Sequence, residues 1–172
     1  LFAGKLTKAK GGEELIKALS LVKSKLQNTA LVIVGQKDTY TERLIKEAQN
    51  ARIKVVNTGW LSEKELPTIY AASDLVVFPS ICFDTFGMVN LEAMISHKPV
   101  IATCFGGAKE VVVDNKTGYI INPFDIQTFA DKMFDLLSNR NLARDFGDAG
   151  YERVVESFSI EKQVTEYLNL YI

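Results

Sequence analysis

The amino-acid sequence predicts an α/β fold: a Rossmann-like, doubly wound parallel sheet of about six strands with helices on both faces and extra C-terminal helices. Short apolar runs alternate with longer amphipathic segments as far as Pro123, which is the pattern of repeated β-α units. The runs 30–34 and 75–78 are apolar throughout, as is typical of strands covered on both faces. Beyond Pro123 only helical patterns follow, so extra helices complete the fold.

Six strands are expected in chain order, and the apolar runs place them at 1–4, 30–35, 54–58, 75–79, 99–103 and 118–121. Helical periodicity between these runs predicts helices at 12–25, 41–51, 63–72, 86–97 and 108–114. Ser62, followed three residues later by Glu65, forms a capping box at one helix start. After Pro123, three helices are predicted at 125–139, 141–157 and 159–172. Because no linker, repeat or low-complexity segment interrupts the chain, we expect one domain over residues 1–172.

The composition excludes several classes of function. The 172 residues carry a formal net charge of −1, so there is no basic excess to neutralise the phosphates of a nucleic acid. A small phosphate-bearing ligand needs only one or two local cations and is compatible with that charge. Cys82 and Cys104 lack metal-type spacing and predict an intracellular protein with free thiols. No apolar stretch approaches the roughly 20 residues of a membrane span.

Both ends of the chain predict that it is part of a longer protein. The N-terminus has no signal-peptide pattern and begins inside the first expected strand, as if more protein preceded Leu1. The last expected helix carries apolar side chains at Tyr167, Leu168, Leu170, Tyr171 and Ile172. This apolar tail is expected to pack on this domain or on a missing partner domain.

Ligands of an open parallel sheet collect at the carboxyl ends of its strands. The first loop at that edge, 4–12, places Lys5, Lys8 and Lys10 with Gly11 and Gly12 between a strand and a helix. Glycines let a backbone approach a ligand, and lysines together with a helix N-terminus attract phosphate. The loop has neither the dinucleotide-binding nor the P-loop glycine pattern, so a solvated polar loop is the alternative interpretation.

The segment 78–94 is the most informative part of the chain. Its loop carries Asp84, and a helix is expected to start near Phe86, where the unpaired amides of the first turn form an anion site. Glu92 is the only charge on this otherwise apolar helix and therefore needs a partner. That partner is either an internal cation such as Lys5 or the hydroxyls of a ligand diol, such as a ribose.

The other polar features have simpler interpretations. Gly106 and Gly107 follow a strand end, where they either form a turn or leave room for a ligand. His97 is the only histidine and is expected to end a helix. One histidine and two dispersed cysteines cannot assemble a zinc site.

Taken in order, these residues resemble the C-terminal domain of retaining glycosyltransferases with the two-domain GT-B fold, particularly glycosyltransferase family four. The resemblance covers nearly the whole chain. Its motifs are Gly4-Lys5-Leu6, Lys10-Gly11, 31–35, Gly59-Trp60-Leu61, Glu65-Leu66 with Tyr70, Ala72-Ser73-Asp74, Phe78-Pro79-Ser80, 84–94, 98–103, Gly106-Gly107, Glu110 and Gly118. The spacing of Asp84 and Glu92, with seven residues between them, is similar to the family's acidic pair.

The resemblance implies catalytic roles for Asp84, Lys5 and Lys10. The two lysines would neutralise the diphosphate of a nucleotide-sugar donor, and Asp84 would approach the transferred sugar. This sequence departs from the family at two of these positions. Asp84 stands where the family usually has Glu and is shorter by a methylene, and Lys5 stands where it usually has Arg and lacks the bidentate fork.

The resemblance also implies a set of donor-binding residues, which are Gly4, Trp60, Leu61, Phe86, Gly87, Met88, Val89 and Glu92. Glu92 would hold the ribose hydroxyls, the amides around Gly87 and Met88 would assist the lysines, and Trp60-Leu61 would form the edge that binds the base. No cofactor is implied, because the donor itself is the substrate. No metal ion is implied either, because such enzymes generally need none held by an Asp-x-Asp motif, and that motif does not occur here.

By the same resemblance, the acceptor would be bound by an N-terminal domain that is missing here. The fragment alone is then expected to bind donor weakly and to transfer little. A cytoplasmic protein is implied, with any peripheral contact with the inner face of the membrane made through the absent half. The alternatives are a non-catalytic nucleotide-sugar-binding module, a GT-B-type nucleotide-sugar epimerase and, more distantly, a response-regulator-like domain.

Overall fold

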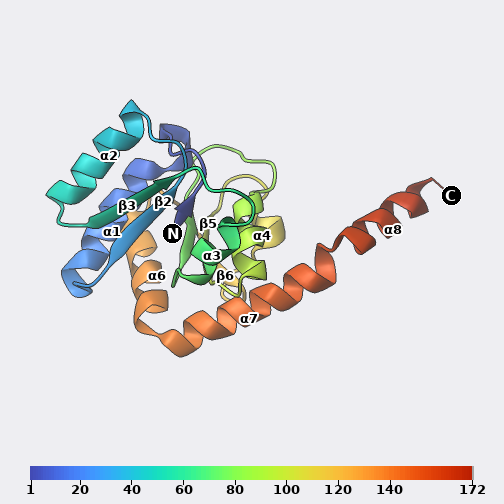
Figure 1. Ribbon diagram of the computed structural model, residues 1–172. Helices are drawn as coiled ribbons and strands as arrows, with labels where there is room; N and C mark the ends of the chain where they lie inside the picture. Colours follow the sequence, from blue (N-terminus) through green and yellow to red (C-terminus); the bar gives the residue numbers. More distant parts are fainter. Residues whose placement is uncertain (172) are drawn as a thin grey trace.

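The structure is a computed structural model and describes residues 1–171. All six expected strands are present (Figure 1), and they are β1 Phe2–Ala3, β2 Ala30–Val34, β3 Lys54–Gly59, β4 Val76–Phe78, β5 Val100–Thr103 and β6 Gly118–Ile121. Every pairing between neighbouring strands is parallel, as the alternation of strands and helices predicts.

The strands form two three-stranded parallel ladders that meet at Leu1. One ladder has the order β1-β2-β3 and the other β4-β5-β6. The Leu1 nitrogen donates to the Leu75 carbonyl over 2.7 Å, and the Leu1 carbonyl accepts from the Val77 amide over 2.9 Å. The strands therefore lie in the order β3-β2-β1-β4-β5-β6. Successive strands are added on one side of β1 as far as β3 and on the opposite side of β4 as far as β6. The topological switch point therefore lies between β1 and β4.

Helices cover both faces of the sheet (Figure 1). They are α1 Gly12–Lys25, α2 Thr39–Asn50, α3 Leu66–Ala71, α4 Met88–Ile95, α5 Ala108–Val111, α6 Ile126–Ser138, α7 Arg140–Ser157 and α8 Ile160–Leu170, with a short 3-10 helix η1 at Lys8–Lys10. On one face α1 packs against α2 and α6, and on the other α4 packs against α3, α5 and α7. The doubly wound α/β fold predicted from the sequence is therefore confirmed.

Each face of the sheet has its own hydrophobic core, which explains why the central strands are apolar at nearly every position. Val77 and Ile101 belong to the core under α1 and α6, whereas Val76, Val100 and Ala102 belong to the core under α4 and α7. Successive strand residues point to opposite faces, so a strand buried on both sides carries few polar residues. In β5 the polar residue is Thr103, whose hydroxyl oxygen accepts from the Phe105 amide over 3.1 Å.

Two helices, α3 and α4, begin two or more residues later than the sequence predicts. α4 starts at Met88 rather than at Phe86, because Gly87 has a φ of 80° and this left-handed conformation cannot continue a helix. α3 starts at Leu66 because residues 63–65 form a turn. The Glu65 carboxylate accepts from the Ser62 amide over 2.8 Å, as a capping box requires, but the Ser62 hydroxyl donates to the same carboxylate rather than capping an amide.

The C-terminal helix α8 leaves the body of the molecule. Figure 1 shows it extending beyond α7, away from the sheet and its covering helices. All of its residues are exposed, including Val164, Tyr167 and Leu168. The prediction that this apolar tail packs on the same domain is therefore wrong, whereas a missing partner stays a prediction; Ile172 lies outside the described residues. No helix within residues 1–171 combines the length and the apolar character that crossing a membrane requires.

Candidate functional site

The carboxyl ends of β1 and β4 meet at the switch point, where open α/β sheets bind their ligands. The loop after β1 carries Lys5 and Lys10, and the loop after β4 carries Asp84 and leads into α4. The two loops are in direct contact, because the Ile81 amide donates to the Ala9 carbonyl over 2.9 Å. The fold therefore brings together, at the candidate site predicted from the sequence, two loops whose residues Lys10 and Asp84 are 74 positions apart in the chain.

Glycines allow these loops to approach one another closely. A Cβ at Gly11 would lie 1.9 Å from the Pro79 carbonyl oxygen, and a Cβ at Gly106 would lie 2.3 Å from the Asp84 carbonyl oxygen. The Gly107 amide donates to that Asp84 oxygen over 2.9 Å. The space left by Gly106 and Gly107 is thus filled by the loop after β4, which favours a structural role for this pair over direct ligand contact.

Lys10 and Asp84 form an ion pair across the two loops, with 2.5 Å between Nζ and Oδ1. Burial acts to raise the pKa of the Asp84 carboxyl, but the hydrogen bond and charge of Lys10, together with the side chains of Ser80 and Cys82, outweigh it, so the pKa lies below its usual value. Asp84 Oδ2 is buried and has no hydrogen-bond partner within the described residues. The sequence predicts that both residues belong to the site, but it does not predict that they bind each other.

Lys5 and Gly4 lie at the same edge of the sheet. The Gly4 amide donates to the Val34 carbonyl over 2.7 Å, which fixes the start of the first loop beside β2. Lys5 is exposed and forms no ion pair with any residue in 1–171. Its ammonium group is therefore available to solvent or to a ligand, unlike that of Lys10.

Trp60 and Leu61 follow β3 at the same edge of the sheet. Trp60 is 68% exposed, and Leu61 is half-buried against the core under α4. The Gly35 amide donates to the Gly59 carbonyl over 3.0 Å, which ties the end of β3 to the end of β2. An exposed indole beside this edge is consistent with the predicted base-binding position but makes no contact with Lys10 or Glu92 that the structure records.

The start of α4 is where the sequence predicts an anion site. A helix that begins at Met88 leaves the amides of its first turn without intrahelical partners, apart from the Asn90 amide, which donates to the Gly87 carbonyl over 2.9 Å. Phe86 anchors the approach to the helix through an edge-on contact with Phe158, with ring centres 5.6 Å apart. Met88 is 60% exposed and Val89 half-buried, so this end of the helix is accessible.

Glu92 has a partner that the sequence interpretation missed. Its Oε2 accepts a hydrogen bond from the Tyr70 hydroxyl over 2.6 Å, and no lysine or arginine within residues 1–171 lies at ion-pairing distance. The proposed internal pair with Lys5 is therefore wrong. Burial, and then the hydrogen bond and charge of Glu92, raise the pKa of Tyr70, so the hydroxyl stays a donor at neutral pH. Glu92 itself is half-buried.

Asn90 is a second polar residue that sequence reasoning missed. It is fully buried on the inner face of α4, and neither its Oδ1 nor its Nδ2 has a hydrogen-bond partner within residues 1–171. A Cβ at Gly87 would lie 2.7 Å from Asn90 Nδ2, so the amide fills the space beneath that glycine. A buried polar group without a partner lowers stability.

We expect truncation of Asn90 to be unusually mild for a fully buried residue. Asn90→Ala loses packing but also removes an unsatisfied amide, so it should lower the free energy of unfolding by less than about 1 kcal/mol. Met94→Ala, at another fully buried position of α4, is the matched control and should cost about 2–4 kcal/mol. Urea unfolding of both variants measures the difference, and an equal cost for the two would contradict an unsatisfied Asn90.

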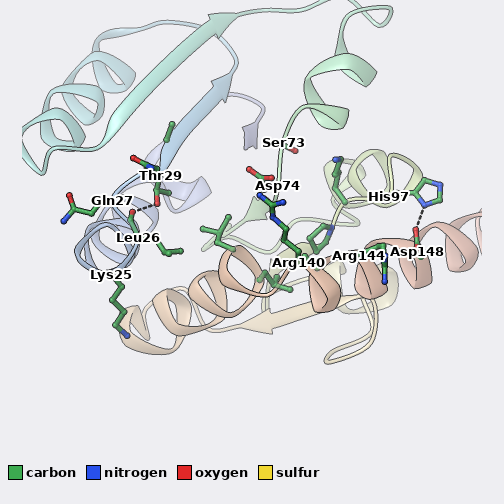
Figure 2. Close-up of a pocket in the computed structure, with 17 residues that line it drawn as sticks. Lys25, Leu26, Gln27, Thr29, Ser73, Asp74, His97, Arg140, Arg144 and Asp148 are labelled. Carbon is green, nitrogen blue, oxygen red and sulfur yellow. Dashed lines mark hydrogen bonds and ion pairs between the residues drawn. The ribbon is translucent and has the colours of Figure 1, made fainter.

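A separate cavity lies at the opposite, amino-terminal edge of the strands (Figure 2). It has a volume of about 930 Å³ and is lined by residues that precede β2, β4 and β5 and by the first turns of α7. His97 lies here and follows the end of α4, as predicted, and its Nδ1 is 2.8 Å from Asp148 Oδ1. Because it opens on the other edge of the sheet, this cavity is not part of the candidate site.

The described residues show no recognisable metal centre. Within 1–171, no three His, Cys, Asp or Glu side chains are grouped so that they could hold a metal ion. Cys82 and Cys104 are both free and half-buried, and the Ser80 hydroxyl lies 3.2 Å from Cys82 Sγ. The polar groups at this edge include Lys5 and Lys10, the amides at the start of α4 and the carboxylates of Asp84 and Glu92.

Residues 1–153 match the protein family described as Glycosyl transferases group 1. The GDP-mannose-dependent alpha-(1-6)-phosphatidylinositol monomannoside mannosyltransferase of Mycobacterium tuberculosis is 35% identical over 158 residues, which are 87% of this chain and 41% of that protein. The trehalose synthase of Thermococcus litoralis is 31% identical over 170 residues, which are 94% of this chain and 40% of that protein. The chain thus spans about two-fifths of the length of these curated relatives.

Solved structures are similar over nearly the whole chain. The C-terminal domain of a glycosyl transferase group 1 family protein from Francisella tularensis superimposes with a TM-score of 0.83 and 30% identity, covering 92% of this chain and 86% of that one. HepE from Anabaena, solved in complex with UDP, superimposes with a TM-score of 0.85 and 25% identity, covering 98% of this chain and 48% of that one.

Proposed function

Because the chain belongs to the Glycosyl transferases group 1 family, we propose that it is the donor-binding half of a retaining glycosyltransferase. In this proposal the full protein transfers a sugar from a nucleotide-diphosphate sugar to a glycan, lipid or small-molecule acceptor. One observation carries the proposal: Lys10, the start of α4 and Glu92 belong to segments that meet at the switch point. Glu92 lies one helical turn beyond Met88.

The chemistry follows from where charge develops. Breaking the bond between the sugar and the diphosphate places negative charge on the leaving group, and fixed cations and helix amides stabilise that charge. Lys10 is already held in place by Asp84, and Lys5 has no competing ion pair within residues 1–171. We assign the neutralisation of the diphosphate to these two lysines and to the amides of Met88 and Val89, rather than to a metal ion.

Asp84 has two roles in the proposal. The first is to orient Lys10, which the 2.5 Å contact supports. The second is to approach the transferred sugar, for which the buried Oδ2 must move with its loop. The first role explains why the shorter side chain of aspartate is compatible with this position. Asp84 already contacts Lys10, so a longer side chain is not required for that contact.

Similar proteins support a nucleotide-sugar donor without defining its base. One relative is named as GDP-mannose-dependent, and HepE was solved with UDP. We therefore leave the base open and propose that the acceptor is bound by the rest of the protein, since the chain spans about two-fifths of its curated relatives. The exposed indole of Trp60 is the side chain that we assign to the base.

We expect Glu92→Ala to abolish stabilisation by the donor while leaving the fold intact. A ligand at 100 times its Kd adds about 2.7 kcal/mol, which for a chain of this size raises Tm by roughly 5–10 °C. If Glu92 holds the ribose hydroxyls, the variant should shift by less than about 2 °C under the same conditions. A thermal-shift screen with UDP-, GDP- and ADP-sugars provides the measurement.

Glu152→Ala is the matched control for this experiment. Glu152 is an exposed carboxylate on α7, away from the loops of the candidate site, so this variant should keep the full shift. The proposal would be overturned if no nucleotide sugar stabilised the wild-type protein, or if Glu92→Ala retained the wild-type shift.

A non-catalytic nucleotide-sugar-binding module is the second candidate. One observation favours it, which is that Lys10 already binds the Asp84 carboxylate and so restrains its approach to a sugar. The two candidates differ in chemistry rather than in binding. Hydrolysis of the bound donor by the full-length protein would identify an enzyme, whereas binding without any turnover would identify a module.

A further inference from the structure

We propose that Tyr70 is a positioning residue for Glu92: its buried hydroxyl fixes one carboxylate oxygen and leaves the other to accept from the ribose of the donor. This inference rests on the proposed function, because it assigns a role in the same ribose subsite. It begins from the 2.6 Å hydrogen bond between Tyr70 Oη and Glu92 Oε2, which joins α3 to α4.

The Tyr70 side chain is held rigidly. It is 2% exposed and belongs to the core under α4, together with Ala93 and Met94. Its carbonyl accepts from the Ser73 amide over 3.0 Å and from the Ser73 hydroxyl over 2.8 Å, which secures the last turn of α3. A phenol fixed in this way presents its hydroxyl at one point, so the carboxylate that binds it loses rotational freedom before any ligand arrives.

A tyrosine is chemically suited to hold a carboxylate that must still bind a diol. An ionised carboxylate accepts about four hydrogen bonds, and Tyr70 takes one of them. The hydroxyl is neutral, so it orients Glu92 without cancelling its charge, as the ammonium of a lysine would. No lysine or arginine within residues 1–171 pairs with Glu92, so its full charge remains for the ribose hydroxyls.

The pairing also explains why Glu92 is tolerated on an apolar helix. α4 buries Asn90, Ala93 and Met94 and carries no other charge, so an unpaired carboxylate would be costly there. Ser96 does not compete for the carboxylate, because its hydroxyl donates to the Glu92 carbonyl over 2.8 Å instead. Tyr70 is therefore the single side chain within the described residues that orients the Glu92 carboxylate.

The test is Tyr70→Phe, which keeps the ring and removes only the hydroxyl. Titration calorimetry first identifies which of UDP, GDP and ADP the wild-type protein binds. Binding of that nucleotide to Tyr70→Phe should be weaker by about ten-fold, because the freed Glu92 carboxylate must then be ordered when the nucleotide binds, at about the cost of immobilising one side chain. Against the 2′,3′-dideoxy form of the same nucleotide, the substitution should change the Kd by less than about two-fold, because the diol is gone.

Two controls separate this effect from a general loss of stability. Tyr119→Phe removes the hydroxyl of another buried tyrosine, on β6, and should leave both affinities unchanged. In a Glu92→Ala background, adding Tyr70→Phe should cause no further loss, since the residue acts through the carboxylate. Thermal unfolding of each variant confirms that the compared proteins are folded.

The outcomes distinguish this inference from the proposed function. If the wild-type protein binds none of the three nucleotides, the proposed function fails and this inference with it. If the wild type binds and Glu92→Ala weakens binding while Tyr70→Phe does not, only the positioning role is wrong. An equal loss for the ribose and dideoxy forms would likewise overturn it, because Tyr70 would then act on the fold or on another part of the nucleotide.

Discussion

Gly11→Ala is expected to lower the free energy of unfolding by about 3 kcal/mol or more. The backbone at Gly11 has a φ of 71°, a left-handed conformation that costs a residue with a side chain roughly 1–2 kcal/mol. The added Cβ would also lie 1.9 Å from the carbonyl oxygen of Pro79, and neither backbone can move without disturbing the end of β4. The first loop should therefore separate from β4, and urea unfolding measures the resulting loss.

Gly59→Ala is a closely matched control. Gly59 has a φ of 73°, but a Cβ there would meet nothing within 4 Å. This variant therefore suffers the backbone strain of a left-handed conformation without a steric clash. We expect it to lose about 1–2 kcal/mol. The excess loss in Gly11→Ala then measures the contact between the two loops, and equal losses would show that this contact is not formed in solution.

Lys10→Met is expected to reduce donor turnover by the full-length protein by about 100-fold or more, the usual effect of removing one fixed group that stabilises a developing anion. The substitution keeps the length of the side chain but removes the ammonium that contacts Asp84 and that we propose neutralises the diphosphate. It should also lower stability, by about 1–2 kcal/mol, because Asp84 is left partly buried without its partner. Steady-state kinetics and urea unfolding measure the two effects.

Two further variants test whether the effects of Lys10→Met come from the position of the Lys10 ammonium or from the loss of any positive charge in this loop. Lys8→Met removes an exposed lysine of the same loop that forms no ion pair within residues 1–171, and it should change both quantities little. Lys10→Met combined with Asp84→Asn should recover much of the stability, since no carboxylate is left unpaired, but none of the turnover. Recovery of turnover in the double variant would contradict the role of Lys10.

The loss of stability in Lys10→Met should depend on pH. Because Lys10 holds the folded-state pKa of Asp84 below its usual value, the pair stabilises the protein above the unfolded pKa of about 3.9. That stabilisation disappears as pH falls through the lower folded-state pKa. The difference in unfolding free energy between the wild type and Lys10→Met is therefore expected to be largest near pH 7 and to become smaller towards pH 3.

The strands and most helices could be predicted because their signals are local. The runs 30–34 and 75–78 are apolar at each position, and the structure places β2 and β4 there. β4 is buried on both faces, whereas β2 leaves Ala30 exposed and Val32 half-buried. The starts of α3 and α4 were predicted too early for an equally local reason, a turn at 63–65 and the left-handed backbone of Gly87. Hydrophobic periodicity marks which residues are buried but not the residue at which the backbone turns.

The candidate site was predictable as a set of residues but not as a set of contacts. Strand ends identified the loops that hold Lys10 and Asp84, yet these residues are 74 positions apart, and no spacing rule links them. Tyr70 and Glu92 are 22 positions apart on different helices, so the hydrogen bond between them depends on how α3 packs on α4. Asn90 was missed because nothing in the sequence distinguishes a buried amide without partners from a satisfied one.

The close backbone contacts between the strand-end loops have a consequence for the entropy of binding. Ile81 bonds to Ala9, Gly107 bonds to Asp84, and Gly11 lies against Pro79, so main-chain contacts connect the three loops in addition to the ion pair of Lys10 with Asp84. Segments connected in this way lose little conformational entropy when a small molecule binds between them. Most of the conformational entropy of these loops is therefore lost during folding rather than during binding. Less of the interaction energy between the charged groups and a ligand is then offset when the ligand binds.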